Sequence, residues 1–91
     1  MSVNHEKHPN WTTRKLLATN ITYLRHKHGW SQEKLAEISN RSVYLISDIE
    51  NAKIGATIDA IDDIGKALGF TTSELTRDNG FVVTKKRVDG K

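Results

Sequence analysis

The chain has 91 residues, of which 36% are hydrophobic and 27% charged, and it contains no cysteine. This composition predicts one globular domain held together by apolar packing, and it excludes disulfide bonds. No apolar run reaches the roughly 20 residues that span a bilayer, and residues 1–10 lack the hydrophobic core of a secretory signal, so we expect a cytoplasmic protein without a membrane partner.

The net charge of +3 is distributed unevenly along the chain. Five basic residues against one acidic residue give residues 1–30 a net charge of +4. Four against eight give residues 31–76 a charge of −4, and five against two give residues 77–91 a charge of +3. Basic segments at both ends slightly favour a polyanionic partner, although solvated lysines are also common.

The N-terminal part of the chain predicts an arm followed by a helix. Residues 1–11 contain the only proline and no periodic apolar pattern, which indicates a flexible arm. Leu17, Ile21 and Leu24 then recur at i, i+4 and i+7, the spacing of one helical face. Gly29 is a natural left-handed terminator, so a first helix is predicted over about 13–27.

Two short helices joined by a tight turn are predicted next. Ser31 can cap the free amides at the start of a second helix, whose inward face includes Leu35. Asn40 can adopt the left-handed conformation that ends this helix. Ser42 can then cap a third helix over about 43–51.

Two further helices complete the predicted domain. Thr57 can cap a fourth helix that ends at Gly69, and its apolar stripe consists of Ile58, Ile61, Ile64 and Leu68. Thr71 and Glu74 have the spacing of a reciprocal capping box, which predicts a fifth helix over about 72–77. Five short helices with short connections make a compact all-α domain over residues 12–77.

Residues 78–91 are predicted to form a basic C-terminal tail. "DNG" breaks the fifth helix, and "FVVTKKRV" has the β-propensity of an extended segment with too few apolar residues to form its own core. The basic residues 85–87 could contact DNA, remain solvated, or flank a strand that pairs across a dimer. The sequence leaves these three alternatives open.

The second and third helices have the spacing of a helix-turn-helix. Only "NR" separates them, so they must cross sharply and share a core. At roughly 100° per residue, one side of the third helix carries Leu45, Ile46 and Ile49 and is predicted to face inward. The opposite side carries Val43, Tyr44, Ser47 and Asn51, with Asp48 at its border, and it is not basic.

A neutral outward side is compatible with reading DNA. Base edges are recognised by hydrogen-bonding and methyl-contacting side chains, whereas phosphate contacts supply affinity. Val43 and Tyr44 could pack on thymine methyls, Ser47 could donate or accept, and Asp48 could accept from a cytosine amine. The alternatives are a Tyr44 ring that covers the domain's own surface and an Asp48 that is solvated or paired locally.

These residues resemble the lambda-repressor-like helix-turn-helix family, which includes Cro-type and xenobiotic-response-element-type regulators. The resemblance covers about residues 16–76, through "NITYLRHKHGWSQEKLAEISNRSVYLISDIENAK" and "TIDAIDDIGKALGFTTSEL". Its strongest signal is "GWSQEKLAE" followed at the right spacing by "IxxIE" and "IGKALG". The resemblance implies a compact five-helix DNA-binding domain of bacterial or phage type.

By resemblance, roles can be placed on individual positions. Gln32 matches a glutamine that contacts phosphate, and Arg25 and Glu50 match a structural ion pair between the first and third helices. Asn51 and Lys53 match the segment that grips phosphate after the recognition helix. The candidate DNA-binding residues are Gln32, Arg41, Ser42, Val43, Tyr44, Ser47, Asp48, Asn51 and Lys53.

The chain also departs from the family pattern. Asn40 and Ala52 replace frequent glycines, and Arg41 stands where many members have an aliphatic residue. Residues 62 and 63, both aspartates, replace a Leu/Lys-like pair, and Gly65 replaces a helical alanine at a cost of about 1 kcal/mol. The early recognition-helix positions lack Gln, Arg or a second Asn, so specificity is expected to be modest or to depend partly on DNA shape.

Neither a cofactor nor an enzymatic function is expected. His5 and His8 lie in the arm, and His26 and His28 are two residues apart and do not share a helical face, so no metal site is predicted. The acidic residues of the first turns of the fourth helix are explained by the helix dipole rather than by catalysis, and these are Asp59, Asp62 and Asp63.

We therefore expect a sequence-specific double-stranded DNA-binding regulator, most simply a small repressor that binds a palindromic operator as a homodimer. The alternative is a protein-interaction module, such as an antitoxin-like subunit or a modulator of another repressor. The acidic middle of the chain and the apolar face of Val43, Tyr44 and Leu45 favour that alternative. The operator and the regulated genes cannot be deduced from the sequence.

Overall fold

The computed structural model describes residues 11–53 and 56–83, and within these residues it contains helices but no strand. The helices are α1 (Thr13–Lys27), α2 (Gln32–Ser39), α3 (Val43–Glu50), α4 (Ile58–Leu68) and α5 (Thr72–Leu75). The expected all-α, five-helix fold is thus confirmed. The expectations for residues 1–10 and 84–91, including His5, His8 and the basic residues 85–87, lie outside the described residues.

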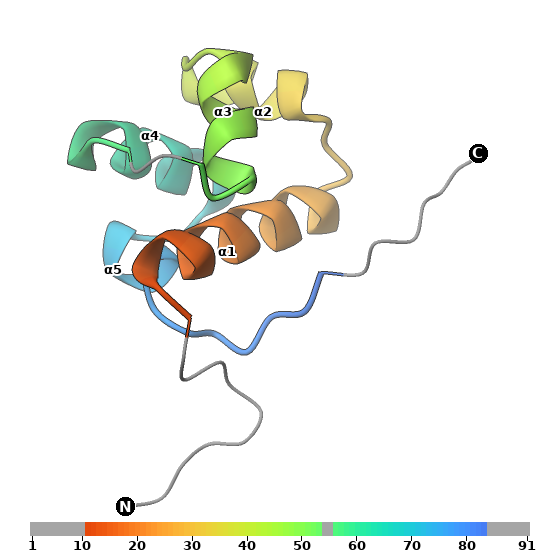
Figure 1. Cartoon of the computed structure of the whole chain (residues 1–91). Coiled ribbons are helices and arrows are strands. Elements are labelled where there is room, and N and C mark those ends of the chain that lie inside the picture. Colours follow the sequence, from red (N-terminus) through yellow and green to blue (C-terminus); the bar gives the residue numbers. More distant parts are fainter. Residues whose placement is uncertain (1–10, 54–55, 84–91) are drawn as a thin grey trace, which may run out of the picture.

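Helix α1 crosses the middle of the molecule (Figure 1). Helices α2 and α3 lie on one side of it, and α4 and α5 lie toward its N-terminal end. α1 packs against α3, α4 and α5, and α2 packs against α3 and α4. The buried apolar cluster between them consists of Leu17, Ile21, Leu24, Leu35, Ala36, Ile46, Ile49, Ile61, Ile64, Leu68 and Leu75.

Every helix begins at a serine or threonine that accepts a hydrogen bond from the backbone amide three residues later. The caps expected at Ser31, Ser42, Thr57 and Thr71 are confirmed, with oxygen to nitrogen distances of 3.0 or 3.1 Å. Thr12 caps α1 in the same way. These bonds satisfy amides that have no partner inside the helix, so short helices can start at defined residues.

α5 is shorter than predicted, because side chains from outside the helix bind its last carbonyls. The buried Asn20 of α1 donates through Nδ2 to the carbonyl oxygens of Leu75 at 2.7 Å and Arg77 at 2.8 Å. Asn79 Nδ2 donates to the Glu74 carbonyl at 2.9 Å. Carbonyls held in this way end the helix at Leu75 instead of near Arg77.

The first turn of α5 forms the predicted capping box. The Thr71 amide donates to Glu74 Oε1 at 2.8 Å, and the Glu74 amide donates to Thr71 Oγ1 at 3.1 Å. The bond from the Thr71 amide lowers the pKa of Glu74 below its ordinary value of 4.5, because it favours the charged carboxylate.

The prediction that Ile58 of α4 lies in the core is wrong. Ile58 was predicted to continue the apolar stripe, but it is 69% exposed. At 100° per residue it lies roughly 90° from the centre of the buried face. Ala60, which is buried, extends that face toward the start of the helix instead.

Tertiary packing requires a glycine at residue 65. The Phe70 amide donates to the Gly65 carbonyl at 2.8 Å, and a Cβ atom on residue 65 would collide with the Phe70 carbonyl oxygen. The departure from the family's helical alanine therefore allows the chain after α4 to pass close to the helix.

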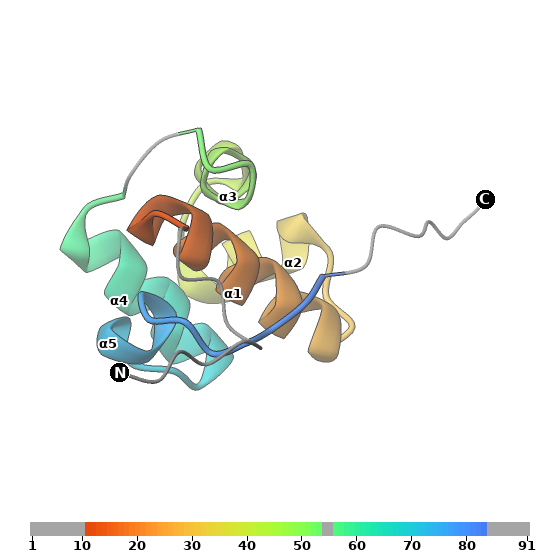
Figure 2. The same ribbon diagram turned by 60° about the horizontal axis from the view of Figure 1, so that its bottom comes forward.

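Residues 79–83 lie against α1 and cross it on their way from α5 (Figure 2). The Phe81 ring stacks on Tyr23 with 4.1 Å between ring centroids, and it lies 6.3 Å from Phe70. The segment forms no strand. The packed part of the domain thus continues past residue 77, where the predicted tail was expected to begin.

Candidate nucleic-acid interface

The joint between α2 and α3 depends on a residue in the left-handed conformation. Asn40 has a φ of 59°, and this conformation lets the Arg41 amide donate to the Ala36 carbonyl at 3.0 Å. α3 follows after Ser42 and buries Ile46 and Ile49 against the core. The expected helix-turn-helix geometry is confirmed.

α3 ends with a second left-handed residue. Ala52 has a φ of 57°, and the amides of Ala52 and Lys53 donate to the carbonyls of Ile49 at 3.0 Å and Asp48 at 2.9 Å. A glycine adopts this backbone without the steric cost that a Cβ atom imposes. The alanine therefore leaves local strain directly after the candidate recognition helix.

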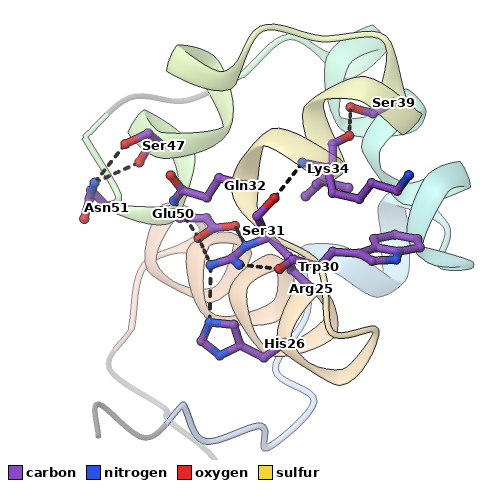
Figure 3. Close-up of polar contacts among 11 residues, drawn as sticks. Arg25, His26, Trp30, Ser31, Gln32, Lys34, Ser39, Ser47, Glu50 and Asn51 are labelled. Carbon is purple, nitrogen blue, oxygen red and sulfur yellow. Dashed lines mark hydrogen bonds and ion pairs between the residues drawn. The ribbon is translucent and has the colours of Figure 1, made fainter. Parts of the chain in front are cut away.

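A buried ionic network fixes α3 to α1 and α2 (Figure 3). Arg25 Nε and Nη2 donate to the two carboxylate oxygens of Glu50 at 2.7 and 2.9 Å. Arg25 Nη1 donates to the Trp30 carbonyl at 2.7 Å, and Gln32 Nε2 donates to Glu50 Oε1 at 3.0 Å. The structural ion pair implied by the family resemblance is confirmed.

This network also orients Gln32 at the start of α2. One amide proton of Gln32 is directed to Glu50, which leaves the second proton and Oε1 for another partner. A carboxylate that receives three donors holds the amide in one orientation. Gln32 is therefore placed beside α3 with a donor that could bind a phosphate.

Arg41 is engaged by α4, which sequence reasoning missed. Its Nε and Nη2 donate to Asp63 Oδ2 at 3.1 and 2.7 Å. Arg41 and Asp63 both depart from the family pattern, and the structure shows that they pair with each other. The pair joins the helix-turn-helix to α4, and Arg41 Nη1 has no hydrogen bond to another of the described residues.

Tyr44 projects from the outward side of α3 and is 80% exposed. Ser47 and Asp48 are half-buried on the same helix. The Asp48 carboxylate has no ion pair or hydrogen bond within the part of the chain that the structure describes. The local pairing considered for Asp48 is thus not found there, and its acceptor oxygens are available.

Val43 was expected on the outward side of α3, but the core covers part of its side chain. Val43 lies three residues before the buried Ile46, and it is half-buried and packs against the core together with Leu45. Ser42 is exposed, and its oxygen accepts the capping bond from the Leu45 amide, which leaves its hydroxyl proton and a second lone pair for another partner.

The end of α3 places Asn51 and Lys53 in the solvent. Asn51 Nδ2 donates to the Ser47 carbonyl at 2.9 Å, and it lies 3.5 Å from Ser47 Oγ. This bond uses one of the two amide protons of Asn51. Lys53 is exposed, and no ion pair is found for its ammonium group among residues 11–53 and 56–83.

The arrangement of α2, the left-handed turn and the exposed side of α3 defines a helix-turn-helix protein. Residues 16–77 match the helix-turn-helix domain family, and the chain belongs to that family. Its members are DNA-binding transcription regulators rather than enzymes.

One relative is the competence pilus inhibition repressor of Acinetobacter baylyi, which is 31% identical over 55 residues. The match covers 60% of this chain and 50% of that repressor, so the chain spans about half of its length.

The solved structures agree on the fold. A hypothetical transcription factor from Neisseria is 28% identical with a TM-score of 0.70, and the alignment covers 74% of this chain and 77% of that one. The restriction-modification controller protein C.AhdI from Aeromonas hydrophila is 24% identical with a TM-score of 0.64, over 68% of this chain and 94% of its own. At this lower identity the likeness concerns the fold alone.

Two further observations concern membrane-spanning helices and metal sites. In the described ranges, no helix is long and apolar enough to cross a membrane. No group of three histidine, aspartate or glutamate side chains gathers there in a way that could hold a metal ion.

Proposed function

We propose that this protein is a sequence-specific repressor that binds double-stranded DNA as a homodimer, with α3 in the major groove of each half-site. The family supplies the class, and the exposed side of α3 supports the specificity. The proposal includes a cytoplasmic location and a two-fold symmetric operator with half-sites about 34 Å apart. Repression would then follow from steric exclusion of polymerase.

The observation that carries the proposal is the exposure of Tyr44 on a helix that is otherwise held rigidly. An aromatic ring that is 80% exposed leaves apolar area in water. The Arg25–Glu50–Gln32 network fixes the helix that presents this ring. A preorganised helix with one projecting ring suits contact with base edges and thymine methyls.

The residues near Tyr44 form two groups, one suited to contact bases and one suited to contact the DNA backbone. Ser47 can donate or accept, and Asp48 can accept from a cytosine amine. The residues proposed to bind phosphate or the adjacent backbone surround them, and these are Gln32, Arg41, Ser42, Asn51 and Lys53. Val43 would contribute only the part of its side chain that the core leaves uncovered.

The alternative of a protein-interaction module loses one of its two supports. It depended on the acidic middle of the chain and on an apolar face of Val43, Tyr44 and Leu45. Val43 and Leu45 pack against the core, so Tyr44 is the member of this face that is left projecting. Capture of a partner that survives nuclease treatment, together with no preferred DNA sequence, would restore this alternative.

The direct test is selection of bound duplexes from a random pool, followed by binding at several salt concentrations. We expect a two-fold symmetric motif and an affinity that falls steeply with salt. Tyr44→Ala should change the preferred bases, whereas Ile38→Ala, a second exposed apolar residue, should not. Recovery of no motif at all would overturn the proposal.

Substitutions of two lysines test the proposed phosphate contacts. Lys53→Ala should weaken binding to every sequence by a similar factor and lower the salt dependence. Lys66→Ala is the matched control, because Lys66 is equally charged but lies on α4 and pairs with Asp62 at 3.4 Å. Equal losses in the two variants would contradict the place given to Lys53.

A further inference from the structure

A groove of about 790 Å³ runs along α1 beside the helix-turn-helix. Gln32 at the start of α2 and Asn51 at the end of α3 contribute to its lining. Residues 81–83 line it as well. The groove is therefore continuous with two positions already proposed to bind the DNA backbone.

The α1 wall of this groove carries a regular row of hydrogen-bond donors. Lys15, Thr19, Thr22 and His26 all line the groove, and their spacing of i, i+4, i+7 and i+11 places them on one face of the helix. Lysine and threonine side chains are frequent ligands of DNA phosphates. The Lys15 ammonium lies 5.0 Å from the centroid of the Trp11 ring, which also lines the groove, and this contact favours its position there.

The charge in the groove is positive despite the presence of a carboxylate. Glu50 is the acidic residue that lines it, and Arg25 binds both oxygens of that carboxylate. The pair is neutral as a unit, and only 5% of the Glu50 side chain is exposed. Lys15 makes no ion pair with another of the described residues, so this groove carries a net positive charge that suits a polyanion.

We propose that one sugar-phosphate strand of the DNA lies in this groove, with Lys15, Thr19 and Thr22 binding successive phosphates beyond the contacts of Gln32 and Asn51. This inference rests on the proposed function, because it extends the same bound duplex onto α1. The spaced donors along α1 suit a polymer of phosphates. The contacts would raise affinity without reading bases.

The experiment compares two neutralising substitutions that are one residue apart. Lys15→Gln and Arg14→Gln remove the same charge from exposed positions of α1, but only Lys15 lines the groove. Each variant is titrated with the duplex selected by the intact protein at several salt concentrations. Lys15→Gln should weaken binding about five- to tenfold near 0.1 M salt and lower the slope of log affinity against log salt by about 0.9.

The control and the reading-face variant separate the two proposals. Arg14→Gln should change the salt slope by much less than Lys15→Gln does. If Tyr44→Ala alters sequence preference but Lys15→Gln and Arg14→Gln behave alike, the α1 contact is overturned and the proposed function stands. If the intact protein binds no duplex specifically, the proposed function fails and the α1 contact fails with it.

Discussion

The two ends of α3 are fastened by ion pairs of the same chemistry in very different surroundings. At its C-terminal end, Glu50 and Arg25 have side chains that are only 5% and 11% exposed, and both carboxylate oxygens are used. Next to its N-terminal end, Arg41 and Asp63 are 30% and 40% exposed, and one carboxylate oxygen accepts both bonds.

This contrast shows where rigidity is concentrated in the fold. Removing one partner of a buried pair leaves an uncompensated charge, whereas water replaces a missing partner at an exposed pair. The buried network joins α1, α2 and α3, so it controls the position of the reading helix. The exposed pair joins the turn to α4 and can be lost at small cost.

The largest effect is expected at the buried end. Glu50→Ala should lower the free energy of unfolding by about 3–5 kcal/mol, because it leaves Arg25 without its charge partner and Gln32 without its acceptor. Urea unfolding would measure this. Glu37→Ala is the control, since Glu37 is 74% exposed and lies 3.7 Å from Lys34. A loss below about 1 kcal/mol for Glu50→Ala would remove the contrast between the two ends.

A smaller effect, of opposite sign, is expected just after the buried end. Ala52→Gly should raise the free energy of unfolding by about 1 kcal/mol, because glycine relieves the cost of a φ of 57°. Asn40→Gly should gain less, since asparagine tolerates a φ of 59° better than alanine does. Thermal unfolding of both variants would rank them, and a larger gain for Asn40→Gly would contradict this reading.

The exposed end should show weak coupling. A double-mutant cycle with Arg41→Ala and Asp63→Ala should give a coupling energy below about 1 kcal/mol. The cycle also tests Arg41 as a DNA ligand. If Arg41 only braces the turn, the two variants should affect DNA affinity alike; a selective loss in Arg41→Ala would support a phosphate contact. A coupling well above 1 kcal/mol would mean that both ends of α3 are equally rigid.

The smallest effect is expected outside α3, in the capping box of α5. It concerns the dependence of stability on pH. Because folding lowers the pKa of Glu74, its contribution to stability is present above pH 4.5 and is lost as the pH falls through the lowered value. Glu74→Gln should remove this part of the acid sensitivity. Unfolding measured at several pH values would show it, and parallel curves for the two proteins would contradict it.

Features that depend on near neighbours in the chain were predictable. The caps at Ser31, Ser42, Thr57 and Thr71 each involve a bond to the amide three residues later, so residue type and spacing were sufficient. The helix-turn-helix followed for the same reason from the short turn between two amphipathic segments. The DNA-binding roles of the individual residues stay predictions.

Features set by contacts between distant segments were not predictable in this way. Asn20 is 55 residues from Leu75, whose carbonyl it binds, and Arg41 is 22 residues from Asp63. Helical periodicity alone placed Ile58 inside and Val43 outside, and both positions lie at the edge of a buried face. At such an edge, the neighbouring helix decides whether a side chain is covered.

By itself, the sequence determined the number of helices and their starting residues, because hydrogen bonds and apolar repeats within a few residues specify these features. The class of protein followed from the resemblance of its motifs to a known family. Only the tertiary structure decided how far α5 extends, why residue 65 is glycine, and which partners Arg41 and Gln32 bind. These outcomes depend on atoms brought together from different helices, and their distances are set by packing rather than by spacing along the chain.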